Sequence, residues 1–226
     1  MPSDVTRIAF HFDILCPWAY QTSKWIRDVR ARTGLEIDWR FFSLEEINRE
    51  EGKKHPWERP WSYGWGMLRV AALLRRTSMD DCDRFYEAAG RALHEEGRKP
   101  HDPSVARAIL AEIDLDPDLV DAAIADETTH DEVRADHEAI VARGGFGVPT
   151  LVFDDDGPTV YGPVVAPAPT GDDVLALWEL VCAYHRIPHL YELKTPKTAA
   201  DLEHIGRVFT PYLTARDWET REKPAP

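Results

Sequence analysis

The sequence predicts an α/β fold in which an all-helical segment interrupts a sheet. Three observations support this: the first 44 residues read as strand, helix and strand, the next hundred are helical in pattern, and strand patterns return after residue 144. The order βαβ, helices, ββα divides the chain into a discontinuous sheet domain (1–44 and 144–194), an inserted helical domain (45–143) and a C-terminal tail (195–226).

The first half of the sheet is predicted by two strand patterns around one helix. Apolar and polar residues alternate from Thr6 to Asp13, which is typical of a strand with one buried face. A helical pattern runs from Trp18 to about Thr33, with Pro17 suited to its first turn and Gly34 to its C-cap. Leu35 to Phe42 form the second strand. The single crossover helix predicts a parallel strand pair.

The inserted segment shows helical periodicity over most of its length. Asp80, Asp102 and Asp116 stand where helix N-caps are expected. The piece from Pro56 to Trp65, rich in proline and tryptophan, breaks the pattern. We therefore expect four or five helices, covering 67–74, 85–93, 105–113, 119–124 and 130–142.

The second half of the sheet is predicted by strand patterns at Val148–Phe153 and Thr159–Gly162, which form an antiparallel hairpin. A final helix is expected from Asp172 to about Arg186, and we expect the polar tail to pack on the body with a helical pattern near Leu202–Val208. This connectivity is that of a thioredoxin-like fold with an all-helical domain inserted between its βαβ and ββα halves.

Charge and composition limit the class of partner. The 226 residues carry a net charge of −13, which opposes binding to a phosphate backbone, so we expect no nucleic-acid partner. No basic leader or long apolar run is present, so we expect neither a secretory signal nor a membrane span. Three widely spaced cysteines fit a reducing compartment, and we expect a cytoplasmic monomer or homodimer.

Cys16 is the main candidate for chemistry because it lies where a strand feeds a helix. A thiolate there faces unsatisfied backbone N–H groups, and such cysteines have pKa values lowered to roughly 3.5–7.5. The alternative is a buried structural cysteine. The helix-starting Pro17 directly after Cys16 favours the reactive interpretation.

Val148-Pro149 is the second candidate element. If this peptide bond is cis, the backbone of Val148 can face Cys16 and hold an extended thiol-containing partner. Only about 5–6% of X-Pro bonds in folded proteins are cis, so the local sequence alone favours trans.

The motifs Cys16-Pro17-Trp18 and Val148-Pro149-Thr150, with helices between them, resemble the DsbA/FrnE-like group of thioredoxin-fold proteins. The chain is most similar to the actinobacterial mycothiol-dependent nitroreductase subgroup, whose members carry a Cys-Pro-Trp-Cys site. Further shared motifs, between Phe10 and Lys194, are Phe12-Asp13, Ser23-Lys24-Trp25-Ile26, Trp65-Gly66, Arg69-Val70-Ala71, Leu93-His94, Tyr161-Gly162-Pro163-Val164 and Pro188-His189-Leu190-Tyr191-Glu192-Leu193-Lys194.

This resemblance implies a cytosolic thiol-disulfide oxidoreductase whose helical insertion closes over the cysteine. It implies no tightly bound cofactor and a low-molecular-weight thiol, mycothiol or similar, as co-substrate with a small-molecule or disulfide substrate. By resemblance Cys16 is the nucleophile, Trp18 a wall of the site and Pro149 the cis-proline. The other binding positions would be Pro17, Ala19, His94, Val148 and Thr150.

Ala19 is the departure from the subgroup, because it occupies the position of the resolving cysteine. A second thiolate there would attack the mixed disulfide and release the partner. Cys82 and Cys182 lie on apolar helix faces and are expected in the core. The sequence therefore predicts a single-cysteine mechanism that depends on an outside thiol.

Trp57, Trp61 and Trp65 repeat at every fourth position. Packing within the insertion is one interpretation, and an aromatic lid over Cys16 for a flat or apolar substrate is the other. The His, Cys and carboxylate residues show no metal-ligand spacing, so we expect no metal.

Two further functions stay open. Kappa-type glutathione transferases and 2-hydroxychromene-2-carboxylate isomerases share the interrupted fold, usually with serine at the nucleophile position, and bind the small thiol non-covalently. A non-catalytic thiol-binding redox sensor is the third hypothesis. A covalent small-thiol adduct favours the first function over the second. Partner binding that survives Cys16→Ser favours the sensor.

Overall fold

A computed structural model describes residues 4–59, 61–154 and 157–216 of the chain. Within them the sheet has the strand order β2-β1-β3-β4. β1 pairs parallel with β2 and antiparallel with β3, and β3 pairs antiparallel with β4. The predicted thioredoxin-like order of elements is confirmed, with strands β1 Arg7–Phe12, β2 Glu36–Phe41, β3 Thr150–Phe153 and β4 Thr159–Tyr161.

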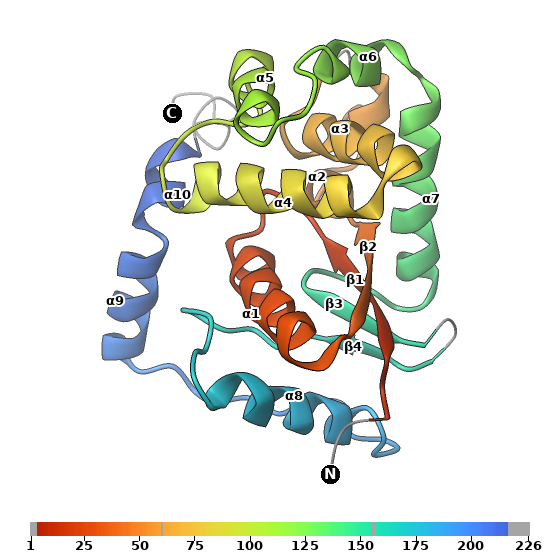
Figure 1. Cartoon of the computed structure of the whole chain (residues 1–226). Coiled ribbons are helices and arrows are strands. Elements are labelled where there is room, and N and C mark those ends of the chain that lie inside the picture. Colours follow the sequence, from red (N-terminus) through yellow and green to blue (C-terminus); the bar gives the residue numbers. More distant parts are fainter. Residues whose placement is uncertain (1–3, 60, 155–156, 217–226) are drawn as a thin grey trace.

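The two faces of the sheet are covered differently. Phe10 pairs with Trp39 in register and Phe12 with Phe41, so these four rings share one face. Helices α1 (Pro17–Thr33) and α8 (Asp173–Tyr184) lie along that face (Figure 1). The other face carries Ala9, against which Ile140 of α7 packs.

Helices fill the chain between β2 and β3, in agreement with the sequence pattern. Asp102 caps α5 as predicted, by accepting a hydrogen bond from the Ser104 N–H. The N-cap predicted at Asp80 is wrong, because Ser78 is the extended residue whose Oγ accepts the N–H of Asp81. The helices are α2 Leu44–Ile47, a 3₁₀ turn Pro56–Glu58, α3 Tyr63–Thr77, α4 Met79–His94, α5 Pro103–Glu112, α6 Leu119–Ala125 and α7 Thr128–Ala142.

The N-cap predicted at Asp116 is also wrong by two residues. Asp118 occupies the N-cap position of α6, and the Asp116 carboxylate accepts the backbone N–H of Asp118 instead. Gly34, in contrast, ends α1 as expected, since its φ of 75° is the left-handed conformation that glycine adopts without strain.

The C-terminal segment is more ordered than its sequence pattern indicates. The weak periodicity near Leu202 lies in α9 (Ala199–Val208), and α10 (Thr210–Ala215) follows without a prediction. Pro211 sits in the first turn of α10, where proline is compatible with a helix. Both helices lie along one side of the molecule, where α10 contacts α4 (Figure 1). The last ten residues of the predicted tail lie outside the described residues.

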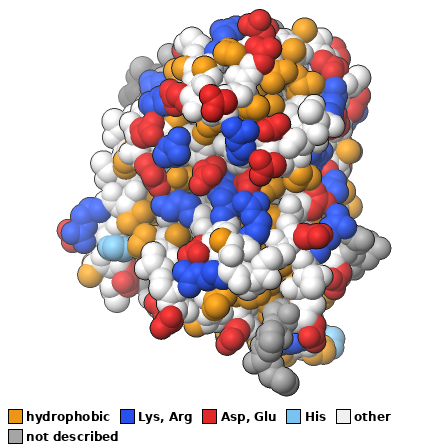
Figure 2. Space-filling view, in the orientation of Figure 1, with side chains coloured by type: hydrophobic (Ala, Val, Ile, Leu, Met, Phe, Trp, Pro, Cys, Tyr) orange, Lys and Arg blue, Asp and Glu red, His pale blue; other side chains and the backbone are white. Residues whose placement is uncertain are grey.

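Charged side chains of both signs are intermingled on the face shown in Figure 2. No helix in the described ranges is both long and apolar enough to cross a bilayer.

Candidate active site

Cys16 is the N-cap of α1, and two backbone groups contact its sulfur. Its Sγ accepts a hydrogen bond from the N–H of Ala19 at 3.4 Å and donates one to the carbonyl oxygen of Val148 at 3.4 Å. The Val148-Pro149 bond is cis. The fold thus brings together the two segments that the sequence singled out, although they lie 132 positions apart.

The thiol of Cys16 is shielded from solvent. Only 5% of the residue is exposed, and burial raises the pKa of the Cys16 thiol to about 12. The N–H of Ala19 acts in the opposite direction but is the smaller effect. The lowered pKa expected from the helix N-terminus is therefore wrong for this closed arrangement. The sulfur rests as a neutral thiol.

An apolar cluster surrounds the sulfur on the sheet side. It includes the half-buried Trp18 and the fully buried Ala19. The position of a resolving cysteine is thus filled by a methyl group inside this cluster. The buried members are Cys16, Ala19, Phe42, Ile140, Val148 and Val152.

Asp13 organises the loop before Cys16, a role the sequence reasoning missed. Its two carboxylate oxygens accept the N–H groups of Leu15 at 2.9 Å and Leu44 at 2.7 Å. Burial raises the pKa of Asp13 to about 7, and its charge in turn raises the pKa of Cys16. An acidic residue at the end of an apolar strand was the available signal. The loop that carries Cys16 therefore also contains a carboxyl group whose pKa lies near 7.

Gly64 lets the start of α3 approach this loop. A Cβ on Gly64 would lie 2.9 Å from the side chain of Leu15 and 3.0 Å from the Asp13 carboxylate. A larger residue at this position would require the side chains of Leu15 and Asp13 to shift.

His94 supports the loop from behind. Its Nε2 lies 2.8 Å from the carbonyl oxygen of Ile14, and its ring stacks on Tyr20 with centroids 5.0 Å apart. Burial lowers the pKa of His94 to about 4, so the ring is neutral at pH 7. The hydrogen bond to Ile14 fixes the backbone two residues before Cys16. These contacts show that His94 supports the loop, and the substrate-pocket role that the resemblance implied stays a prediction.

The proline side of the site is anchored by backbone hydrogen bonds. The carbonyl of Pro149 accepts the N–H of Gly162 at 2.8 Å, and the Thr150 hydroxyl donates to the Gly147 carbonyl at 2.7 Å. Beside them the rings of Phe146 and Tyr161 pack with centroids 4.7 Å apart, and both rings are exposed. This side of the site presents an aromatic surface on a fixed loop.

The three tryptophans of the insertion pack within it. Trp65 is buried and its indole N–H bonds to the ring of His130 at 2.8 Å, while Trp57 packs on Trp65 at 5.2 Å. Trp61 donates to the carbonyl of His101 at 2.6 Å. These contacts within the insertion are those of the packing interpretation, and the lid over Cys16 stays a prediction.

Cys82 and Cys182 are core residues, as expected, with 0% and 1% exposure. Among the described residues no group of three or more His, Cys, Asp or Glu side chains is placed to hold a metal ion.

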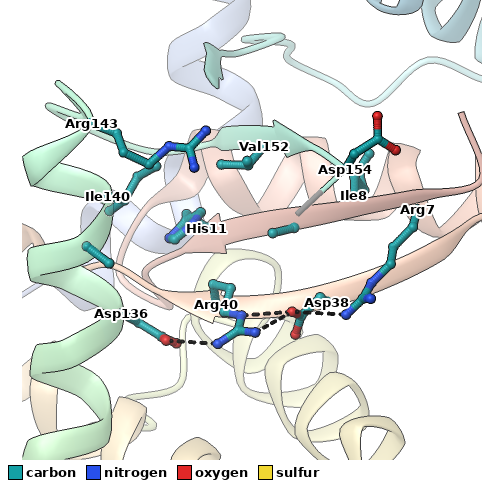
Figure 3. Close-up of a pocket in the computed structure, with 12 residues that line it drawn as sticks. Arg7, Ile8, His11, Asp38, Arg40, Asp136, Ile140, Arg143, Val152 and Asp154 are labelled. Atoms are coloured by element: carbon teal, nitrogen blue, oxygen red, sulfur yellow. Dashed lines mark hydrogen bonds and ion pairs between the residues drawn. The ribbon is translucent and has the colours of Figure 1, made fainter. Parts of the chain in front are cut away.

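A polar pocket of about 170 Å³ opens on the second face of the sheet (Figure 3). Arg40 lies between Asp38 and Asp136 and bonds to both, at 2.6 and 3.2 Å. These ion pairs balance charge within the pocket, and its volume is below the roughly 300 Å³ at which ligand pockets begin. We therefore place the candidate site at Cys16, whose apolar cluster shares Ala9, Ile140 and Val152 with the lining of this pocket.

The fold is thioredoxin-like, with an inserted helical segment and a cysteine at the start of its first helix. Solved structures agree: a probable DsbA oxidoreductase from Streptomyces coelicolor matches with a TM-score of 0.55 and 20% identity, covering 85% of this chain and 94% of that chain. The cytosolic disulfide reductase DsbM from Pseudomonas aeruginosa matches with a TM-score of 0.55 and 17% identity, over 78% and 98% of the two chains. These matches establish the fold.

The chain belongs to the Rv2466c-like family, described as mycothiol-dependent nitroreductase Rv2466c, which it matches over residues 15–195. It is 56% identical over 214 residues to an uncharacterized Mycobacterium tuberculosis protein, Rv2286c, covering 95% of this chain and 92% of the relative. A 2-hydroxychromene-2-carboxylate isomerase from Sphingobium xenophagum is 24% identical over 174 residues, covering 66% and 89%. The resemblance inferred from the motifs is confirmed.

Proposed function

We propose that this protein is a single-cysteine thiol-disulfide oxidoreductase or thiol transferase that depends on a small external thiol. One observation carries the proposal: Cys16 occupies the N-cap of α1 against Val148, while the resolving position is the buried methyl group of Ala19. The other two cysteines are enclosed in the core.

The reaction proceeds by two thiol-disulfide exchanges. The Cys16 thiolate attacks one sulfur of a disulfide R–S–S–R′, so that the Cys16–S–S–R bond forms and R′S⁻ leaves. A small thiolate R″S⁻ then attacks the sulfur of R, which releases R–S–S–R″ and regenerates the Cys16 thiolate. No net oxidant is required, because each step exchanges one thiolate for another.

The backbone around the sulfur supports each step. The N–H of Ala19 points at the sulfur and stabilises the thiolate that leaves in the second exchange. The Val148 carbonyl accepts the thiol proton in the resting state. Mycothiol is the small thiol we propose, because the family is described as mycothiol-dependent.

Intact-mass analysis tests this proposal. The protein is incubated with the symmetric disulfide of mycothiol, and we expect one adduct, mapped to the peptide containing Cys16 and removed by excess mycothiol. In Cys16→Ser the rate of adduct formation should fall by at least about 1000-fold, because a hydroxyl does not exchange with a disulfide. Cys82→Ser is the matched control and should keep it. Wild-type protein that stays unmodified at pH 8 would contradict the proposal.

A second candidate is an enzyme that binds the small thiol without a covalent bond. The 24% identical isomerase relative favours it, together with a similar fold in a solved 2-hydroxychromene-2-carboxylate isomerase (TM-score 0.57). This candidate predicts saturable mycothiol binding to Cys16→Ser with unchanged affinity and no adduct on the wild type. Titration calorimetry on the two proteins separates the candidates.

A further inference from the structure

The chain continues past the region that matches the family, and its last described part returns to the active site. We define the C-terminal arm as Thr198–Arg216, which contains α9 and α10. The family match ends at residue 195, so the arm lies outside it. Its contacts with the body therefore lie outside the region that the family model matches, although the 214-residue match to the Mycobacterium tuberculosis relative includes most of the arm.

The arm is loosely attached along its first half. α9 buries no residue, and every residue from 191 to 204 is exposed. Its second half is docked: Phe209 is 6% exposed and Ala215 is 2% exposed. Segments with few buried contacts open at low free energy relative to the core. The N-terminal half of the arm is therefore exposed, and its C-terminal half is packed on the body.

The docked end of the arm contacts Trp18 of α1 and His94 of α4, which lie next to Cys16 and to the loop before it. The edge of Phe209 packs on the ring of Trp18, with centroids 4.8 Å apart at 87°. Tyr212 packs on His94, the support of the loop, at 5.1 Å. Trp18 belongs to the cluster that buries Cys16. Phe209 thus holds a residue that packs beside the reactive sulfur.

We propose that the C-terminal arm holds Trp18 over Cys16, with Phe209 as the positioning residue, and that a thiol partner reaches the sulfur only after the arm detaches. This inference rests on Cys16 being the reactive group of the proposed function. Detachment of the arm lets a thiol or disulfide reach the buried sulfur of Cys16. Detachment frees Trp18 and lessens the burial of Cys16 while the N–H of Ala19 stays in place, which weakens the main cause of the raised pKa and keeps the opposing one.

A disulfide that locks the arm is the sharpest test. A Cβ on Gly97, at the end of α4, would lie 4.0 Å from the Cβ of Pro211 in the arm, within the range of about 3.5–4.5 Å that disulfides span. In the oxidised Gly97→Cys/Pro211→Cys variant, we expect iodoacetamide to alkylate Cys16 at least about tenfold more slowly than in the same variant reduced. Peptide mass mapping assigns each alkylated cysteine. Because Gly97 has a φ of 66°, Gly97→Cys alone controls for strain.

The opposite change removes the positioning ring. Phe209→Ala should accelerate Cys16 alkylation at pH 7.5 by about tenfold and leave Cys82 unreactive. Leu202→Ala is the matched control, since Leu202 lies in the same arm and is 59% exposed. Equal acceleration of Cys82 would indicate general unfolding and would overturn the proposal, as would rates that neither the lock nor Phe209→Ala changes.

These measurements also separate the arm from the proposed function. Iodoacetamide reports access to the sulfur whether or not a small-thiol disulfide reacts there. A lock that slows alkylation in a protein that forms no mycothiol adduct keeps the arm proposal and contradicts the function. If the mycothiol adduct forms at the same rate in locked and reduced protein, the proposed function is kept and the arm proposal is contradicted.

Discussion

Cys16 and Cys82 lie near the N-termini of two helices in almost equally buried surroundings. Cys16 is 5% exposed and Cys82 is 0% exposed, and burial raises the pKa of each thiol to about 12. The two cysteines differ in the groups that contact their sulfur atoms. In α1 the sulfur of Cys16 is itself the cap, whereas in α4 the hydroxyl of Ser78 caps the helix and Cys82 lies inside the first turns.

This comparison shows that burial alone does not separate a reactive cysteine from a structural one. The sulfur of Cys16 faces a helix N–H and a loop carbonyl, and Trp18, which packs against its cluster, contacts Phe209 of the arm. Cys82 is enclosed by the hydrophobic core. In the proposed mechanism the arm and Trp18 move away from Cys16 without unfolding the sheet, whereas Cys82 becomes accessible only when the core opens.

The pH profile of alkylation gives the largest expected contrast. Because burial raises the pKa of Cys16 to about 12, its thiolate fraction should grow about tenfold per pH unit. We expect the alkylation rate of Cys16 to rise by about 1000-fold between pH 6 and pH 9 without a plateau, while Cys82 stays unmodified. Phe209→Ala should shift the profile to lower pH. A plateau near pH 7 in the wild type would show a thiol already activated in the closed state.

Ala19→Cys should break the dependence on an outside thiol. A thiol one turn from Cys16 attacks the mixed disulfide within the molecule, where effective concentrations are very high. We expect the lifetime of the mycothiol adduct, followed by intact mass without free thiol, to fall by at least about 100-fold, with an intramolecular disulfide between Cys16 and the introduced cysteine as product. Ala19→Ser is the size-matched control and should leave the lifetime unchanged. A long-lived adduct in Ala19→Cys would show that the methyl position does not reach the sulfur.

Much of the fold was predictable because local patterns and tertiary structure agree. The alternation in β1, the helical run of α1 and the left-handed Gly34 each have a local cause that the sheet reinforces. The C-cap at Gly34 and the N-cap at Asp102 were predicted correctly, whereas the N-caps of α4 and α6 were not. Ser78 and Asp118 were missed because several acidic residues crowd each helix start, and backbone conformation decides among them.

The position of Cys16 was also predictable, whereas its ionisation and its cover were not. A helix start is a local feature, but the extent of desolvation depends on Ile140, Val152 and other residues far along the chain. α10 was missed because its six residues include Pro211 and carry too little periodicity. The aromatic ring that packs on Trp18 is that of Phe209. It lies in a segment whose sequence pattern does not predict that it would contact the active site.

Stability should rank the two cysteines in the reverse order of reactivity. Cys82→Ala leaves a cavity in the core and should lower the free energy of unfolding by about 1–2 kcal/mol. Cys16→Ala removes a weak cap and should cost less than about 1 kcal/mol. Urea denaturation of both variants measures the difference. An equal or larger loss for Cys16→Ala would show that Cys16 also has a structural role.

Asp13→Asn should give the smallest effect, and one that depends on pH. The pKa of Asp13 is raised to about 7, so the carboxyl is neutral at pH 5.5 and charged at pH 8.5, where it opposes the thiolate of Cys16. Removing this charge should speed Cys16 alkylation about two- to fivefold at pH 8.5 and leave it unchanged at pH 5.5.

The pH dependence of the free energy of unfolding provides a second test of Asp13→Asn. A carboxyl whose pKa is raised on folding favours the folded state below the unfolded value of 3.8, and this contribution is lost as pH rises to about 7. The wild type should therefore lose stability relative to Asp13→Asn between about pH 4 and pH 7, with a constant difference above. If alkylation accelerates equally at both pH values, Asp13 acts on Cys16 through the Leu15 and Leu44 hydrogen bonds of the loop rather than through its charge.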